Sequence, residues 1–175
     1  MNNIVIGVHA GHARYGIGSG AIGCISESKY NRKIAHYVRK YLKKYGYTVL
    51  NTTVDTGSQK EVLNSIYNNS KKCTHNISIH LNAGGGKGFE TLVKNNDSNI
   101  TKLNDKIAKE LNFYNRGVKV RNDLFVLNRL NNCILFECGF VDNLYDTSIV
   151  SQGYKQIGKT IAKHYHDYLT NRKGK

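Results

Sequence analysis

The sequence lacks any long apolar run, and it has no proline or tryptophan among its 175 residues. A helix that crosses a membrane needs roughly 20 consecutive apolar residues, so membrane insertion is not expected. The chain starts as Met1-Asn2-Asn3 and leads directly into an apolar stretch. That start lacks the charged and apolar regions of a secretory signal, so we expect synthesis in the cytoplasm and another route of release.

Cysteine is sparse and irregularly spaced. The four residues are Cys24, Cys73, Cys133 and Cys138, with no C-x-x-C pair. This pattern excludes a zinc ribbon and a disulfide scaffold, and it predicts reduced thiols. Cys133 and Cys138 flank an apolar strand pattern, where cysteine behaves as a small hydrophobic residue.

Acidic residues are scarce, with 12 Asp and Glu against 26 Lys and Arg, which gives a net charge of +14. This excess would draw the chain to a polyanion such as nucleic acid, an acidic lipid surface or an anionic cell-wall polymer. Charge alone does not choose among them. The length predicts one domain, at 1–170, followed by a polar tail or the start of a linker at 171–175.

The apolar periodicity predicts strands that alternate with helices. This order is typical of the α/β class, here one domain with a twisted, mostly parallel sheet of about six strands and helices on both faces. Predicted strands cover 4–8, 47–50, 76–83, 89–94, 124–127 and 133–136, predicted helices cover 26–45, 58–69, 97–112 and 151–169, and a turn is predicted at 115–117.

Side chains that can bind a metal follow three of the predicted strands. His9 and His12 follow the first strand, His80 lies near the end of the strand at 76–83, and Glu137 follows the strand at 133–136. In an open α/β sheet these residues converge on the edge where such proteins build their sites. The pattern indicates a metal-dependent hydrolase, for which zinc is the natural ion.

Glu27 has two explanations from its position alone. Ser26 is a candidate N-cap, which puts Glu27 in the first turn of a helix. A carboxylate there either interacts favourably with the helix dipole or points back into the site as a metal ligand. His164 and His166 are two residues apart and cannot form a metal pair on one helix face, so they are predicted at the surface, like His36 and His75.

Other chemistries fit less well. The glycine-rich segment 82–88 lacks the G-x-x-x-x-G-K-[ST] pattern of a phosphate-binding loop, because Gly88 follows Lys87. No serine lies in a G-x-S-x-G elbow, and Cys138 has no assigned histidine partner. These absences disfavour a nucleotide site and a serine or cysteine nucleophile.

In these motifs the chain resembles the zinc-dependent N-acetylmuramoyl-L-alanine amidases of bacterial autolysins and phage endolysins (amidase type 3) over residues 4–169. The six matching segments occur in the same order. They are His9-Ala10-Gly11-His12, Glu27 within 25–31, Ser78-Ile79-His80-Leu81-Asn82-Ala83, Gly88-Phe89-Glu90-Thr91, Asn115-Arg116-Gly117-Val118 and Glu137-Cys138-Gly139-Phe140.

The resemblance implies a function and a set of roles. His12, Glu27 and His80 would bind one Zn²⁺, and Glu137 would be the catalytic general base, with Asn82 a candidate for substrate binding. The substrate would be peptidoglycan, cut between N-acetylmuramic acid and L-alanine, in the cell wall that the enzyme reaches after release. Anionic wall polymers are further candidate partners, nucleic acid is not expected, and the oligomeric state is left open.

One segment departs from the family pattern. The family usually has Asp-Pro where this chain has His9-Ala10, so His9 either replaces a residue that supports the metal ligands or competes with His12 for the metal. Two rival functions remain: a zinc carboxypeptidase-like enzyme acting on the stem peptide, and a basic domain that binds wall polymer or nucleic acid without catalysis.

Overall fold

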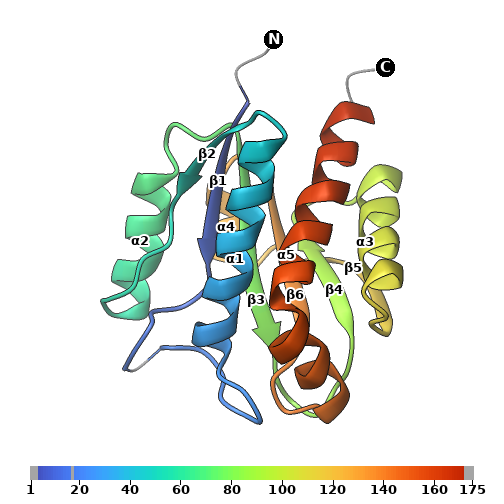
Figure 1. The fold of residues 1–175 in the computed structure, drawn as a ribbon. Helices are drawn as coiled ribbons and strands as arrows, with labels where there is room; N and C mark the ends of the chain where they lie inside the picture. The colour runs from blue at the N-terminus through green and yellow to red at the C-terminus, as the bar shows by residue number, and fades with distance from the viewer. Residues whose placement is uncertain (1–3, 17, 172–175) are drawn as a thin grey trace.

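The computed structural model describes residues 4–16 and 18–171, and within them six strands form one sheet (Figure 1). The strands are β1 Val5–Ala10, β2 Thr48–Asn51, β3 His75–Asn82, β4 Phe89–Val93, β5 Asn115–Val120 and β6 Cys133–Phe140. Their order is β2-β1-β3-β6-β4-β5, and every neighbouring pair is parallel except β4 with β6. The predicted mostly parallel sheet of about six strands is confirmed.

Helices cover both faces of this sheet, as predicted. They are α1 Glu27–Lys44, α2 Gln59–Asn69, α3 Ser98–Glu110, α4 Phe125–Arg129 and α5 Leu144–Asn171. In Figure 1, α1, α3 and α5 lie side by side on one face, and α2 and α4 contact each other on the other face. No helix in the described part of the chain has both the length and the apolarity that a membrane span requires.

Two apolar cores result from this layering. Ile34, Val38 and Leu42 form one stripe of α1 and are fully buried against the sheet and α5. A smaller core on the other face contains Val62 and Ile66 of α2. Burying a side chain of this size contributes about 1.5–3 kcal/mol, so both helices are held mainly by packing.

Two helix starts agree with the sequence prediction. Ser58 and Glu61 form a reciprocal capping box at the start of α2, and the Asp97 carboxylate accepts hydrogen bonds from the backbone N–H groups of Asn99 and Ile100 at the start of α3. Ser26 occupies the N-cap position of α1, but its side chain makes no capping hydrogen bond.

The topology creates a crevice beside β1. From β1 the chain crosses through α1 to β2 on one side, and then through α2 to β3 on the other side of β1. The connections after β1 and β3 therefore diverge at the carboxyl ends of these strands. Open α/β sheets bind ligands at such a switch point.

The predicted strand at 124–127 is wrong. Leu124 is the N-cap residue of α4, whose Val126 and Leu127 are buried against the smaller core. A short apolar run has the same composition whether it forms a buried strand or one buried helical turn. Packing between α2 and the sheet decides the outcome here.

The predicted turn at 115–117 is also wrong, because these residues begin β5. The pairing register shifts by one residue between Phe89 and Thr91 of β4, and Gly117 has a φ of 76°. The turn-forming glycine thus produces a β-bulge within a strand.

Several elements extend beyond their predicted ends. β1 continues to Ala10 and β6 to Phe140, so His9 and Glu137 lie inside strands. α5 begins at Leu144 instead of residue 151, because the Asn143 side chain accepts hydrogen bonds from the backbone N–H groups of Tyr145 and Asp146. Of the predicted tail, Asn171 ends α5, and 172–175 lie outside the described residues.

The surface prediction for His164 is wrong. Its side chain is buried between α3 and α5, and Nε2 lies 2.8 Å from Glu110 Oε2. His166 is partly buried, stacked on Tyr45, whereas His36 is exposed as predicted. The four cysteines are free thiols, as predicted, and Cys133 and Cys138 are buried.

Candidate active site

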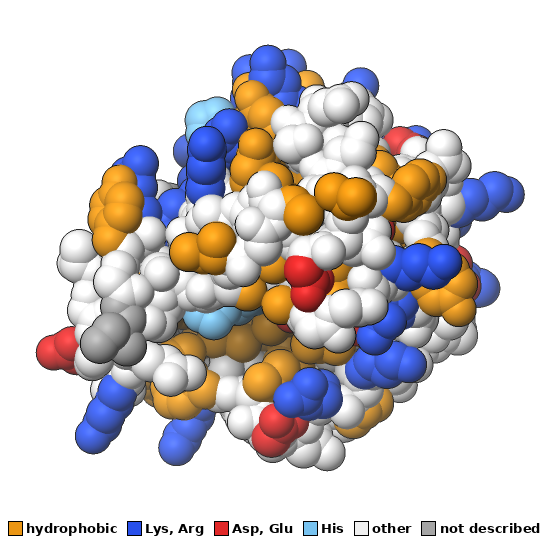
Figure 2. Space-filling view, turned by 90° about the horizontal axis from the view of Figure 1, so that it is seen from below, with side chains coloured by type: hydrophobic (Ala, Val, Ile, Leu, Met, Phe, Trp, Pro, Cys, Tyr) orange, Lys and Arg blue, Asp and Glu red, His pale blue; other side chains and the backbone are white. Residues whose placement is uncertain are grey.

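Three side chains that can bind a metal meet at the carboxyl ends of β1 and β3. His12 follows β1, Glu27 is the first residue of α1, and His80 lies in β3. One donor atom from each residue lies within 4.8 Å of the others. Glu27 Oε1 is 3.4 Å from His12 Nε2 and 3.0 Å from His80 Nδ1. Figure 2, which looks at this end of the molecule, shows a histidine side chain inside a hollow.

The Glu27 carboxylate is held between the two imidazoles by backbone groups. Its Oε2 accepts a hydrogen bond of 2.9 Å from the Ala21 N–H, and its Oε1 accepts one of 3.2 Å from the Leu81 N–H. Burial raises the pKa of Glu27, but hydrogen bonds from His12 and His80 outweigh it and hold the pKa far below its usual range. The residue is 2% exposed, so its carboxylate faces the site.

His80 keeps an affinity for a proton despite its burial. Desolvation lowers the pKa of His80, but the hydrogen bond to Glu27 and the charges of Glu137 and Glu27 outweigh it and raise the pKa above its ordinary value. The same negative surroundings attract a divalent cation.

The loop after β1 is built closely around these residues. A Cβ added at Gly11 would overlap the His80 ring, and one added at Gly20, where φ is +82°, would lie 2.5 Å from Glu27 Oε2. Only glycine tolerates both the close approach and the left-handed backbone at position 20. Two imidazole nitrogens and one carboxylate oxygen are a donor set of catalytic zinc sites, so the residues fit this metal.

Glu137 lies beside this group on β6. It pairs with His80 across the parallel strands, and both side chains line one pocket of about 390 Å³. Within the described chain, Glu137 Oε2 is buried without a hydrogen-bond partner. Burial, together with the charges of Glu27 and Glu90, outweighs the charge of His80 and raises the pKa of Glu137 to about 7. A carboxylate with this pKa can accept and release a proton near neutral pH.

His9 lies in the same pocket but outside the group of three donors. It is 1% exposed, and neither ring nitrogen has a hydrogen-bond partner among the residues that the structure describes. Burial, and then the charge of His80, lower the pKa of His9 to about 3, so its imidazole is neutral. The structure separates His9 from the metal-competent group that contains His12.

Asn82, the candidate substrate-binding residue, belongs to a polar chain at the end of β3. Its Nδ2 donates a hydrogen bond of 2.8 Å to Glu90 Oε1, and its Oδ1 accepts one from the Ala83 N–H. Glu90 Oε2 is also 3.0 Å from Arg116 Nε. These two bonds use half of the hydrogen-bonding capacity of the Asn82 side chain, and a role in substrate binding stays a prediction.

The pocket is suited to a substrate with both apolar and polar parts. One wall is apolar and is built from α2, α4 and the sheet. Arg121 and Asp123 also line the pocket and form an ion pair, with Arg121 Nη2 2.7 Å from Asp123 Oδ2. The apolar lining residues are Val62, Leu63, Ile66, Leu92, Leu124, Phe125, Val126 and Leu135. Pockets of this size and lining are typical of binding sites for small ligands.

Comparison with known sequences identifies the family. The sequence profile described as N-acetylmuramoyl-L-alanine amidase (Amidase_3) matches residues 6–166. The chain belongs to this family. The matched range contains the three residues of the metal-competent group and the neighbouring carboxylate of Glu137.

Individual relatives of this amidase-family chain agree with the assignment. Residues of the chain are 35% identical over 83 positions to N-acetylmuramoyl-L-alanine amidase CwlM of Bacillus licheniformis, a match that covers 45% of this chain and 33% of that protein. The chain therefore matches only about a third of the length of this curated relative.

Solved structures extend the likeness to the whole fold. The catalytic domain of the CD27L endolysin, described as targeting Clostridium difficile, superposes with a TM-score of 0.82 at 26% identity, covering 94% of this chain and 97% of that one. Cwp6 from Clostridium difficile gives a TM-score of 0.81 at 27% identity, covering 95% of this chain and 29% of that one.

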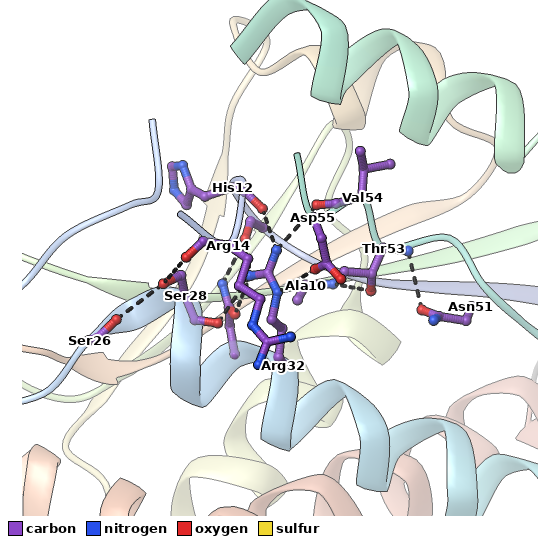
Figure 3. Close-up of polar contacts among 12 residues, drawn as sticks. Ala10, His12, Arg14, Ser26, Ser28, Arg32, Asn51, Thr53, Val54 and Asp55 are labelled. Carbon is purple, nitrogen blue, oxygen red and sulfur yellow. Dashed lines mark hydrogen bonds and ion pairs between the residues drawn. The ribbon is translucent and has the colours of Figure 1, made fainter. Parts of the chain in front are cut away.

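The structure adds Arg32 to the site of this amidase-family chain (Figure 3). Its guanidinium donates hydrogen bonds to the carbonyl oxygens of His12 at 3.0 Å and Val54 at 3.2 Å, and to Asp55 Oδ1 at 2.8 Å. His12 has a φ of 62°, which is rare for a residue with a side chain. Arg32 thus ties the backbone of His12 to α1 and to the loop after β2.

Sequence reasoning missed Arg32 because it resembled the other basic residues of α1. Its partners are backbone carbonyls and the Asp55 side chain in two distant loops, which leave no signal in spacing. Glu90 and Arg116 lie in the matched segments, but their mutual ion pair was equally hidden in the sequence.

Proposed function

We propose that this protein is a zinc-dependent N-acetylmuramoyl-L-alanine amidase that hydrolyses bacterial peptidoglycan. In this proposal, His12, Glu27 and His80 hold the metal, and Glu137 is the general base. The observation that carries the proposal is the convergence of these three donors beside Glu137. His12, His80 and Glu137 line one pocket, and Glu137 Oε2 is buried without a hydrogen-bond partner in the described chain.

A bound zinc ion supplies a Lewis acid, which polarises the scissile carbonyl and makes water more acidic. The chain supplies the proton acceptor. Glu137, whose pKa is raised by burial, would remove a proton from the attacking water and deliver it to the leaving nitrogen. A C–O bond forms and the amide C–N bond breaks, which leaves a carboxylate on the lactyl group and a free amine on L-alanine.

The substrate assignment rests on family membership and on the relatives, which are described as amidases and as an endolysin. The pocket geometry alone supports metal-assisted hydrolysis of a substrate with both apolar and polar parts. Peptidoglycan is accordingly the proposed partner, and the bacterial cell wall is the proposed place of action.

Product analysis on purified peptidoglycan tests the proposal. We expect new N-terminal L-alanine and glycan strands whose muramic acid carries no peptide, with both products lost on addition of a chelator and regained with Zn²⁺. Glu137→Gln should lower product formation by about 10²–10⁴-fold and leave the bound metal unchanged. Glu110→Gln, on α3, is the matched control and should retain activity.

The rival functions predict other products. A peptidase that acts on the stem would leave alanine attached to muramic acid, and a binding domain would release nothing. Either result with metal-loaded protein would contradict the amidase assignment.

A further inference from the structure

A second groove lies on the other side of the loop that holds His12. The α1 groove, as we name it, has a volume of about 890 Å³ and runs between this loop, α1 and Tyr154 of α5. Gly18 of the loop lines the catalytic pocket, whereas Gly16 and Ser19 line the groove. The two cavities therefore border the same loop.

The α1 groove is basic throughout. Arg14, Lys29, Arg32 and Lys33 line it, and no Asp or Glu among the described residues does so. Arg32 is paired with Asp55, but no carboxylate of the described chain forms an ion pair with Arg14, Lys29 or Lys33. Three positive charges thus remain uncompensated along one groove, which favours an anionic ligand.

Tyrosine rings hold several of these cations in place. Lys33 Nζ lies 4.9 Å from the centroid of Tyr30 and 4.6 Å from that of Tyr154, and the Arg14 guanidinium lies 5.1 Å from that of Tyr15. Such contacts restrain long side chains and leave their charges directed at a ligand.

Exposed apolar side chains border the same groove. Tyr15 is 70% exposed and Ile22 is 78% exposed, and both lie in the loop. The combination of fixed cations with exposed apolar side chains fits a polymer that alternates phosphate groups with short carbon segments.

The occupied ring faces argue against nucleic acid. Binding of single strands depends on bases that stack on open aromatic faces. Here Lys33 already lies over the rings of Tyr30 and Tyr154, so the groove-side faces of these two rings offer little room for a base. A chain of polyol units linked by phosphodiesters needs only the cations and the hydroxyl groups.

We propose that the α1 groove binds a polyol-phosphate polymer of the cell wall and so anchors the catalytic pocket beside its substrate. The choice of a wall polymer rests on the proposed function, which brings the protein to the wall. The geometry itself requires only a flexible polyanion without bases.

Calorimetry of the metal-loaded protein with purified polyglycerol phosphate, which has no amide bond to cleave, tests the proposal. In Lys29→Gln/Lys33→Gln we expect the affinity for the polymer at 100 mM salt to fall about tenfold. The fall of the logarithm of the association constant with the logarithm of salt concentration should become shallower by about 1.4, for two lost phosphate contacts. The double variant Lys29→Arg/Lys33→Arg keeps both charges and should bind as the wild type does.

A matched control removes two charges elsewhere. Lys102→Gln/Lys106→Gln has the same net charge and the same i, i+4 spacing on α3, and it should change affinity less than about twofold. Equal losses in both Gln variants, no binding by the wild type, or tighter binding of a DNA oligonucleotide with the same dependence on Lys29 and Lys33 would each overturn the proposal.

The outcome is separable from that of the proposed function. Amide cleavage is measured on peptidoglycan from which phosphodiester polymers have been removed. Cleavage without polymer binding would overturn the anchoring groove alone, whereas polymer binding without cleavage would support the groove and contradict the amidase assignment.

Discussion

The Arg32 guanidinium donates a hydrogen bond of 3.0 Å to the backbone carbonyl of His12, a residue with a left-handed backbone. The same guanidinium contacts Asp55 and the carbonyl of Val54. Arg32 therefore fixes the backbone of His12, and with it the place of the His12 imidazole beside Glu27 and His80.

Replacing Arg32 should weaken metal binding without removing a ligand. A lysine cannot contact these separate acceptors at once, so in Arg32→Lys we expect the affinity for Zn²⁺ to fall about 10–100-fold, as for other residues that orient metal ligands. Titration with a competing chelator measures this change. Arg39→Lys is the control, because Arg39 lies on the same helix but contacts Val8 of β1. Equal effects of both variants would contradict the role of Arg32.

His9 should be dispensable for the metal. Its buried ring nitrogens have no partner in the described part of the chain, and an unsatisfied buried polar group costs about 1–3 kcal/mol. We therefore expect His9→Leu to keep one metal per chain and to raise the free energy of unfolding by about 1 kcal/mol. Metal analysis and chemical denaturation measure these quantities. Loss of metal in His9→Leu would show instead that His9 binds the metal or supports its ligands.

Gly11 should be required for the site even though it carries no functional group. A methyl group at this position overlaps the His80 ring, so Gly11→Ala should displace the ring and lower the affinity for Zn²⁺ at least about tenfold. Strain from the added methyl group should also cost about 1–3 kcal/mol of stability.

The control for Gly11 is a glycine with open space around it. Gly153, within α5, has no atom within 4 Å of an added Cβ, so Gly153→Ala should stabilise the protein by about 0.5–1 kcal/mol and leave metal binding unchanged. Full metal affinity in Gly11→Ala would show that the loop can move away from His80.

Glu110 should make the free energy of unfolding depend on pH. Its hydrogen bond from Lys163, and then those from His164 and Thr160, outweigh desolvation and lower its pKa from 4.5 to about 2. A lowered pKa in the folded state contributes stability above pH 4.5, and this contribution is lost as the pH falls from 4.5 towards 2. Because the group is partly exposed, the contribution is at most about 1 kcal/mol.

Denaturation of Glu110→Gln across this pH range checks the expectation. The free energy of unfolding should be lower than that of the wild type at pH 7, and the two curves should converge as the pH falls to about 2. A constant difference at every pH would mean that Glu110 acts through packing alone.

The sequence located most of the site because its residues lie at strand ends and in short motifs. His12, His80 and Glu137 follow apolar runs, and parallel strands bring such residues to one edge of the sheet. Glu27 was different, since a carboxylate in the first turn of a helix has two explanations. Its contact with the backbone of Leu81 comes from a distant segment, and the one with Ala21 depends on how the preceding loop folds back, neither of which spacing reveals.

Errors in the predicted fold arose where tertiary packing overrides local composition. The apolar residues of α4 suit a strand equally well, and Gly117 suits a turn as well as a bulge. The partner of His164 is 54 residues away on α3, so its burial leaves no sign in the local sequence. The antiparallel direction of β4 likewise depends on pairing with a strand much later in the chain.

The two outer strands of the sheet discourage unwanted self-association. β2 is only four residues long, and β5 is interrupted by its bulge at Gly117 and carries exposed Lys119. Short, bulged or charged rims are poor templates for an additional strand from another molecule. These rims therefore give the folded protein resistance to amyloid-like aggregation.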